Sequence, residues 1–368
     1  MKTLVLGGYG NFGARISRAL AVEPSIDLII GGRDLSRSHA LAASIGGNVK
    51  GIPIDHTKAD FSETLKQFGI ELLIHTAGPF QQQDYQVAKA AAKAGAHYID
   101  LADGRRFVCD FRNNLDVVFR AAGCIAISGA STVPALSSAV VDHLCKGWQR
   151  IDSIDICIAP AQSAPRGKAT LAAVLSYCGE SLEVWNHGVW QSLRGWASPQ
   201  PVQFKRLQPR KAALCDIPDL ELFPKYYSVK QRVMFQAAVE VGFAQKTFAV
   251  LAALRAWGIV PNPSRLAGLL NFTAPAFDFL GSSLGGMFVR VEGVTSDGAV
   301  VKRAWHIAAD NDHGPEIPCM AAILLARKIS TKELLSTGAF ACVSMLELKD
   351  FELEFAKWGM VTDVVEEN

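Results

Sequence analysis

The sequence lacks the features that mark a membrane-spanning or secreted protein. Its 368 residues contain no uninterrupted apolar run of about eighteen residues, so a membrane-spanning helix is not expected. The apolar run that follows Met1 and Lys2 lasts only four residues before glycines interrupt it. Because this run is too short for the hydrophobic region of a signal peptide, we expect a cytoplasmic location.

Paired cysteines and an excess of charge of one sign are also missing. The eight cysteines are scattered singly and form no Cys-x-x-Cys pair, so neither a zinc motif nor a disulfide framework is indicated. The 37 basic and 35 acidic residues nearly cancel, which excludes the basic footprint of a nucleic-acid-binding protein. No P-loop and no Ser/His/Asp elbow occurs either. The length is sufficient for two domains.

The chain does contain a glycine-rich turn at its start. The apolar residues 3–6 predict a buried strand, and residues 14–20 continue a helical pattern. Between them, three glycines have the Gly-x-Gly-x-x-Gly spacing, which permits a tight turn, close approach of a pyrophosphate and close packing of helix on strand. The first N–H groups of the helix are then available to phosphates. The predicted cofactor contacts here are Gly8, Gly10, Asn11, Phe12 and Gly13.

The carboxylate that would hold the ribose 2′-hydroxyl of NAD is absent. The second apolar run, residues 28–30, ends in two glycines and Arg33, so a guanidinium stands where the acid is expected. Asp27 lies at the wrong end of this strand to replace it. Arg33 is suited to lie on the adenine and pair with a 2′-phosphate, with Ser36 and Arg37 nearby; a surface arginine is the alternative. We therefore predict NADP rather than NAD.

The region 1–147 alternates strand and helix signals, which predicts a doubly wound parallel sheet. A third strand over 49–54 ends at Asp55, which either reaches the adenine or caps a loop. A fourth strand over 72–74 is followed by small residues and a Gly-Pro pair, a sequence that suits a backbone lying close to a cofactor. The further predicted cofactor contacts are Asp55, Ala77, Gly78 and Pro79.

The pattern changes near residue 148. Residues 154–158, 287–294 and 300–307 alternate with a period of two, and Ser296-Asp297-Gly298 predicts a hairpin turn between the last two. We therefore expect a second α+β domain over 148–330 with a mixed or antiparallel sheet. Within it, residues 243–284 are unusually apolar. A buried helical layer or dimer surface, an apolar substrate pocket, and an interfacial membrane contact are the three interpretations of this segment, of which we favour the first.

Several motifs together resemble the saccharopine dehydrogenase-like oxidoreductases, in particular their bacterial, functionally undefined branch. They are Gly8-Tyr9-Gly10-Asn11-Phe12-Gly13, Gly32-Arg33, Ala77-Gly78-Pro79-Phe80, residues 95–100, 129–134, 279–282, 286–289, 313–318 and 337–342. The resemblance implies an NADP-binding Rossmann domain, a second domain around a mixed sheet, a C-terminal segment (331–368) that packs back on the first domain, and a homodimer. Members of this family act on different substrates, so it transfers no reaction.

Candidate catalytic residues follow from their positions beside strand ends. Asp103 follows the fifth predicted strand (98–101) and is a candidate proton-handling acid, with a helix N-cap as the alternative. His75 directly follows the fourth predicted strand, and His313 lies in a polar cluster at 310–316; structural roles are the alternative for both. Because no further ligand at a recognisable spacing accompanies Asp310, Asp312 and His313, we predict no metal site.

These observations favour an NADP-dependent oxidoreductase that transfers a hydride to or from a small molecule, with little required of the protein beyond a placed nicotinamide and a pocket. A reductase for a lipid or another apolar substrate is a second hypothesis, motivated by residues 243–284. A catalytically silent dinucleotide-binding sensor or scaffold is a third. We expect no nucleic-acid partner and no membrane contact.

Overall fold

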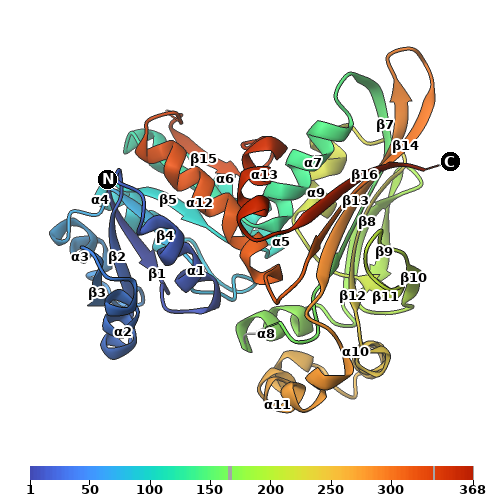
Figure 1. Ribbon diagram of the computed structural model, residues 1–368, viewed down its shortest axis with the longest axis horizontal. Helices are drawn as coiled ribbons and strands as arrows, with labels where there is room; N and C mark the ends of the chain where they lie inside the picture. The colour runs from blue at the N-terminus through green and yellow to red at the C-terminus, as the bar shows by residue number, and fades with distance from the viewer. Residues whose placement is uncertain (165–167, 335, 368) are drawn as a thin grey trace. The chain divides into compact units, whose positions relative to one another are not determined.

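The computed structural model describes residues 1–164, 168–334 and 336–367. The chain divides into two units, Met1–Leu136 with Glu316–Leu346, and Ser137–Pro315 with Glu347–Asn368 (Figure 1). Sequence predicts an α/β protein with a parallel sheet followed by a mixed sheet, and this fold class is confirmed.

The first unit is built on a seven-stranded sheet with the order β15-β6-β5-β4-β1-β2-β3. All of its neighbouring strands pair in parallel. The strands are β1 (Lys2–Leu6), β2 (Asp27–Gly32), β3 (Lys50–Pro53), β4 (Leu72–His75), β5 (His97–Asp100), β6 (Ile125–Ser128) and β15 (Gly338–Ala341). The order reverses direction at the pair β1–β4, and ligands of such sheets bind outside the carboxyl ends of the strands at this point.

Helices of the first unit connect these strands. They are α1 (Asn11–Leu20), α2 (Leu35–Ile45), α3 (Phe61–Gln67), α4 (Gln86–Ala94), α5 (Arg105–Cys109), α6 (Phe111–Ala121) and α12 (Ile317–Ser330). Helix α1 buries Gly13, Ile16 and Leu20, a spacing of three and four residues that places them on one helix face. Helices α5 and α6 follow one another directly and meet at Asp110.

Helix α12 belongs to the first unit, although the predicted second domain extends to residue 330. It lies along α1, where Cys319 Sγ donates to the carbonyl of Phe12 at 3.6 Å. Arg327 Nε donates to Glu23 at 2.6 Å and the hydroxyls of Ser25 and Ser330 are 2.8 Å apart. These contacts explain why residues 316–330 belong to the first unit and not to the second domain expected over 148–330.

The second unit contains a mixed sheet with the order β10-β11-β12-β7-β13-β14-β16. Beside this path, β8 pairs with β12 and β9 pairs with β8. Only β12 and β7 pair in parallel along this path. The strands are β7 (Trp148–Ala159), β8 (Ser181–Asn186), β9 (Val189–Arg194), β10 (Gln200–Val202), β11 (Arg210–Leu214), β12 (Arg232–Val239), β13 (Gly285–Thr295), β14 (Val300–Ala309) and β16 (Val361–Glu366).

The turn predicted at Ser296-Asp297-Gly298 connects β13 and β14, and Gly298 adopts a φ of +86° there. The helices of this unit are α7 (Ser137–Leu144), α8 (Lys168–Ser176), α9 (Asp219–Tyr226), α10 (Gly242–Ala256), α11 (Ala267–Thr273) and α13 (Leu348–Lys357). Helix α7 packs on β13 and β14, and β16 pairs with β14. The units therefore differ again from the expected domains, because 137–147 and 347–367 lie with the second sheet.

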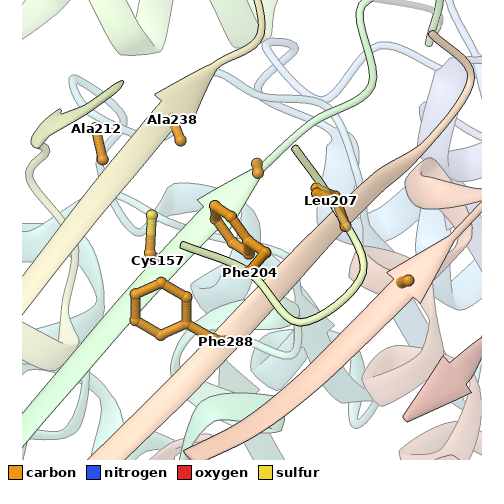
Figure 2. Packing of buried hydrophobic residues seen from close by; sticks show 8 residues of the cluster. Cys157, Phe204, Leu207, Ala212, Ala238 and Phe288 are labelled. Atoms are coloured by element: carbon orange, nitrogen blue, oxygen red, sulfur yellow. The ribbon is translucent and has the colours of Figure 1, made fainter. Parts of the chain in front are cut away.

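Small side chains on one face of the second sheet make room for a loop that covers them. Cys157, Ala212 and Ala238 come from three strands of the sheet, and Phe204 and Leu207 come from the loop between β10 and β11 (Figure 2). Phe204 packs on Phe288 with ring centroids 5.2 Å apart. This arrangement fills the sheet surface at the β7–β13 pairing, where large residues on every strand would not fit.

The apolar segment 243–284 forms α10, α11 and two short 3₁₀ helices, Pro263–Leu266 and Ala274–Leu280. Many of its large apolar side chains are exposed in the second unit, with Phe272 at 83% and Phe279 at 79%. The others are Val250, Trp257, Ile259, Leu269, Phe277 and Leu280. The favoured interpretation of a buried helical layer therefore does not hold within this unit, and a dimer surface stays a prediction. No helix in the described part of the chain is both long and apolar enough to cross a membrane.

One buried carboxyl in the second unit gives a pH-dependent prediction. Asp219, at the start of α9, is fully buried; its Oδ1 accepts a hydrogen bond from Ser137 Oγ, and burial raises its pKa to about 7. The unfolded chain ionises near the ordinary value of 3.8, so stability falls as pH rises from about 4 to 7, and the full loss is present above 7. Asp219→Asn keeps an acceptor for Ser137 and removes the charge.

We expect Asp219→Asn to be more stable than the wild type at pH 8 by ~2–4 kcal/mol and equally stable at pH 4. Urea unfolding at both pH values measures this difference. Glu292→Gln, at an exposed position on β13, is the control and should show no such pH dependence. Equal differences at both pH values would show that burial of the Asp219 charge does not limit stability.

Candidate dinucleotide-binding site

The turn between β1 and α1 is formed by backbone alone. The N–H groups of Gly7 and Gly8 donate to the carbonyl of Gly31 on β2 at 2.8 and 3.2 Å, and the N–H of Gly10 donates to the carbonyl of Gly7 at 2.8 Å. Gly7 has a φ of +78°, a conformation that favours glycine. Gly7, which lies directly before the Gly-x-Gly-x-x-Gly spacing, is therefore the residue of this turn with the left-handed backbone.

Two glycines of the motif are required by close packing. A Cβ on Gly13 would lie 2.3 Å from the carbonyl oxygen of Gly7, and a Cβ on Gly8 would lie 2.8 Å from that of Val5. A Cβ on Gly10 would approach only the Gly7 carbonyl, at 3.1 Å. The short distances around Gly13 therefore agree with the expectation that this glycine lets the helix approach the preceding backbone closely.

The first turn of α1 presents its backbone without a side-chain cap, because the N-cap is Gly10. Asn11 and Phe12 lie in this turn. Arg15 Nη1 donates to the backbone carbonyl of Asn11 at 2.7 Å and also contacts its side chain, while Arg15 Nε donates to Glu316 at 2.7 Å. Glu316, directly before α12, thus helps to fix the start of α1, a role for which the sequence carries no local signal.

Exposed basic side chains lie at the end of β2. Arg33, the first residue after the strand, is exposed, and its positive charge helps to lower the pKa of Asp55. Arg37 is also exposed, and its guanidinium lies over the ring of Tyr9 with Cζ 4.5 Å from the ring centroid. Asp34 Oδ1 accepts a hydrogen bond from the N–H of Arg37 at 3.1 Å as the N-cap of α2. Tyr9, inside the glycine motif, was not among the predicted contacts.

Asp55 follows β3 and holds its own loop. Its Oδ1 accepts hydrogen bonds from the N–H of Thr57 at 3.0 Å and from the Thr57 hydroxyl at 2.8 Å. These two bonds are the main reason why the pKa of Asp55 lies below its ordinary value. The geometry matches the loop-capping alternative, and contact of Asp55 with an adenine stays a prediction.

The loop after β4 lies directly against the glycine turn. The N–H and the hydroxyl of Thr76 each donate to the carbonyl of Leu6 at 2.9 Å. A Cβ on Gly7 would lie 3.2 Å from Ala77, and a Cβ on Gly13 would lie 2.8 Å from Thr76 Oγ1. The structure thus brings predicted contacts from β1 and β4 together and adds Thr76, which connects them.

The remainder of this loop is held by one glutamine. Gln83 Nε2 donates to the carbonyls of Ala77 and Pro79 at 2.8 and 2.9 Å, and the Gly78–Pro79 peptide bond is cis. A Cβ on Gly78 would contact only Phe80, at 3.4 Å or more. The backbone of the predicted contacts Ala77, Gly78 and Pro79 is therefore fixed by a side chain from the same loop.

His75 lies beneath this loop as a buried and neutral group. It is 1% exposed, its Nδ1 is 3.0 Å from the hydroxyl of Tyr98, and burial lowers its pKa to about 3. Asp100, its partner in register on β5, is fully buried and accepts three hydrogen bonds at 2.9 Å, from Ala102 N, Ser128 Oγ and Gly129 N. Burial raises the pKa of Asp100 to about 6. These contacts match the structural alternative for His75.

The other two candidate catalytic residues lie in different units. Asp103 follows β5 in the first unit and accepts a hydrogen bond from Gln81 Nε2 at 3.0 Å, while the N-cap of α5 is Gly104. His313 lies in the second unit, where its Nδ1 is 3.1 Å from the carbonyl of Trp358 and its ring packs edge-on against the indole at 4.9 Å. Catalytic roles for all three residues stay predictions.

The polar cluster at 310–316 is tied to neighbouring serines. Ser283 Oγ donates to Asp310 and Ser163 Oγ donates to Asp312, each at 2.6 Å. The described residues contain no group of three or more His, Cys, Asp or Glu side chains placed to hold a metal ion.

Two arginines of the second unit that could bind a carboxylate substrate, Arg206 and Arg210, are paired within the protein. Arg206 forms two hydrogen bonds with Asp363, at 2.6 and 2.9 Å. Arg210, 6% exposed, donates to the carbonyls of Pro160 and Leu284 and lies 3.4 Å from Glu240. The arginine at position 166 lies outside the described residues.

Comparison with known families identifies the type of domain that contains the glycine turn, α1 and the β4 loop. Residues 3–126 match the family model described as the saccharopine dehydrogenase NADP binding domain. The first unit carries a saccharopine dehydrogenase-like NADP-binding domain. The predicted resemblance is confirmed at this level, whereas the bacterial, functionally undefined branch stays a prediction.

Solved structures extend the likeness in fold to the whole chain. Saccharopine dehydrogenase (L-Glu forming) from Saccharomyces cerevisiae matches with a TM-score of 0.74 and 13% identity, covering 100% of both chains. The DAP dehydrogenase of C. glutamicum in complex with DAP matches with a TM-score of 0.49 and 14% identity, covering 96% of this chain and 98% of that one. An engineered D-amino acid dehydrogenase bound to NADP+ gives a TM-score of 0.49 at 16% identity over 96% and 98%. Comparison with proteins of curated function gave no match.

Proposed function

We propose that the protein is an NADP-dependent oxidoreductase that transfers a hydride to or from a small molecule. The observation that carries the proposal is the backbone turn Gly7–Gly13, packed against Thr76 and Ala77 and free of side-chain caps. Such a turn offers N–H groups to a diphosphate and leaves space for it. The matching NADP-binding domain supports the same cofactor.

Charge at the end of β2 supports NADP over NAD. Arg33 and Arg37 are exposed there, and the acid between them in sequence, Asp34, accepts the N–H of Arg37 as a helix cap. Guanidinium groups pair well with phosphate, whereas NAD selection uses a carboxylate on the ribose hydroxyls. When bound, the cofactor would supply the hydride chemistry, and the chain would supply its binding and orientation.

The proposed substrate is a small molecule other than a polycarboxylate. Saccharopine-type substrates carry several carboxylates, which need clustered cations. Among the described residues, Arg206 and Arg210 are bound by Asp363, by backbone carbonyls and by Glu240. We therefore place the protein outside true saccharopine chemistry while keeping the hydride transfer. Asp103, His75 and His313 stay the candidate proton-handling groups, and a cytoplasmic homodimer stays the expected form.

A reductase for an apolar substrate is the second candidate. The exposed side chains of α10, α11 and the 3₁₀ helix Ala274–Leu280 favour it, because large exposed apolar surfaces mark sites of interaction. Turnover of NADPH with acyl substrates rather than polar carbonyl compounds would support this candidate. A dinucleotide sensor, the third hypothesis, predicts NADPH binding without turnover of either class.

Thermal unfolding with each nucleotide tests the proposal. A ligand that binds the native state raises its stability by RT ln(1 + [L]/Kd), so NADPH should raise the melting temperature more than NADH at equal concentration. With NADPH at ~100 times its Kd, the stabilisation is ~2.7 kcal/mol. Equal shifts would contradict the choice of NADP, and no shift with either nucleotide would contradict a dinucleotide site.

A further inference from the structure

We infer that Tyr9 sets the nucleotide selectivity of this site by holding Arg37 beside the end of β2 and by occupying the space that a side chain at position 32 would need. The inference rests on the proposed NADP function and names the residue that determines its selectivity. Tyr9 acts here as a positioning residue, because its effect on the 2′-phosphate passes through Arg37.

The ring of Tyr9 fills the space next to the last residue of β2. A Cβ on Gly32 would lie 2.3 Å from Tyr9 Cε1, 2.7 Å from Cζ and 2.8 Å from the hydroxyl oxygen. The φ of Gly32 is not positive, so this ring and not the backbone conformation excludes a side chain there. The ring of Tyr9 therefore keeps position 32 free of any side chain, acidic or other, next to Arg33, which stands where the acid is expected.

The hydroxyl of Tyr9 fixes the ring in this position. It accepts a hydrogen bond from the N–H of Asp34 at 3.1 Å, at the corner where β2 turns into α2. Asp34 in turn accepts the N–H of Arg37 through its side chain. One aromatic residue thus connects the glycine turn with the first turn of α2.

The face of the ring carries a guanidinium. Arg37 Cζ lies 4.5 Å from the ring centroid, within the range of a cation–π interaction. An exposed arginine otherwise loses rotamer entropy when it binds a phosphate. Because the ring already holds Arg37 near this corner, part of that entropy is lost before the ligand arrives. The affinity gained in this way applies to the 2′-phosphate and not to the other parts of the dinucleotide.

Binding of 2′,5′-ADP and 5′-AMP to the full chain, measured by isothermal titration calorimetry, isolates the effect from the nicotinamide. We expect Tyr9→Leu to weaken binding of 2′,5′-ADP by ~2–5-fold and to leave binding of 5′-AMP unchanged, from the size of a cation–π interaction at an exposed site. Tyr9→Phe keeps the ring and should retain most of the affinity for 2′,5′-ADP. In an Arg37→Ala background, Tyr9→Leu should have no further effect on the ratio of the two affinities.

Gly32→Ala reaches the same state by another route, since its methyl group displaces the ring. It should reduce the preference for 2′,5′-ADP as Tyr9→Leu does, and the two changes together should equal either one alone. Unchanged selectivity in Tyr9→Leu, or a full effect in the Arg37→Ala background, would overturn the role of Tyr9 while NADP binding stands. If wild-type protein binds 2′,5′-ADP no better than 5′-AMP, the proposed NADP function fails and this inference with it.

Discussion

Gly13→Ala is expected to abolish NADPH binding and to destabilise the first unit. The added Cβ would lie 2.3 Å from the carbonyl oxygen of Gly7 and 2.8 Å from Gly8 Cα, so helix α1 has to move away from the turn. Alanine improves helix propensity by only ~1 kcal/mol, which does not offset a collision with backbone atoms. We expect a loss of ~2–4 kcal/mol in stability and a decrease of at least ~100-fold in NADPH affinity.

Two other glycines separate the effect on folding from the effect on binding. A Cβ on Gly10 meets only the Gly7 carbonyl at 3.1 Å, so Gly10→Ala should fold nearly as well as the wild type and still lose affinity for the diphosphate. A Cβ on Gly242, in the second unit, meets nothing within 4 Å, and Gly242→Ala is the neutral control. Thermal unfolding and NADPH titration measure both properties. Unchanged NADPH binding in both Gly10→Ala and Gly13→Ala would contradict a diphosphate site at this turn.

Local patterns in the sequence were sufficient for most of the first sheet. Short apolar runs and glycines at fixed spacing report on neighbouring residues, and β1 and β2 lie within two residues of the predicted strands 3–6 and 28–30. The hairpin between β13 and β14 was also predictable, because its turn sequence and its alternating flanks are local.

Features that depend on distant parts of the chain were not predictable in this way. Helix α12 has buried residues around most of its circumference, a pattern that predicts burial without saying against which sheet. Its attachment to α1 through Arg15–Glu316 and Arg327–Glu23 involves residues about three hundred positions apart. The same reason explains why the two units differ from the expected domains.

In the candidate site, too, the residues that follow a local sequence pattern were predictable, and those that depend on contacts with distant residues were not. The roles expected of Gly8 and Gly13 follow from a known spacing, and the geometry around both fits them. Tyr9 and Thr76 were missed, because their importance arises from contacts with β2 and with the glycine turn that no spacing rule describes. In the sequence, His75, Asp100 and Arg33 are all polar residues at or next to strand ends. The structure distinguishes them, because His75 and Asp100 are buried and Arg33 is exposed.

Arg33→Ala is expected to remove most of the preference for NADPH. Arg33 is exposed at the end of β2, and the next residue, Asp34, uses its side chain to cap α2. A charge-assisted contact with phosphate contributes ~1.5–3 kcal/mol, so NADPH affinity should fall by ~10–100-fold while NADH affinity stays within ~2-fold.

Arg18→Ala is the matched control, since it removes the same charge from an exposed position on α1. Fluorescence or calorimetric titration with both nucleotides at two salt concentrations measures the effect, and the wild-type preference for NADPH should decrease as salt screens the phosphate. An equal loss of NADPH and NADH affinity would show that Arg33 acts on the adenine or on folding. An unchanged ratio would show that residues other than Arg33 select the 2′-phosphate and would contradict the role proposed for Arg33.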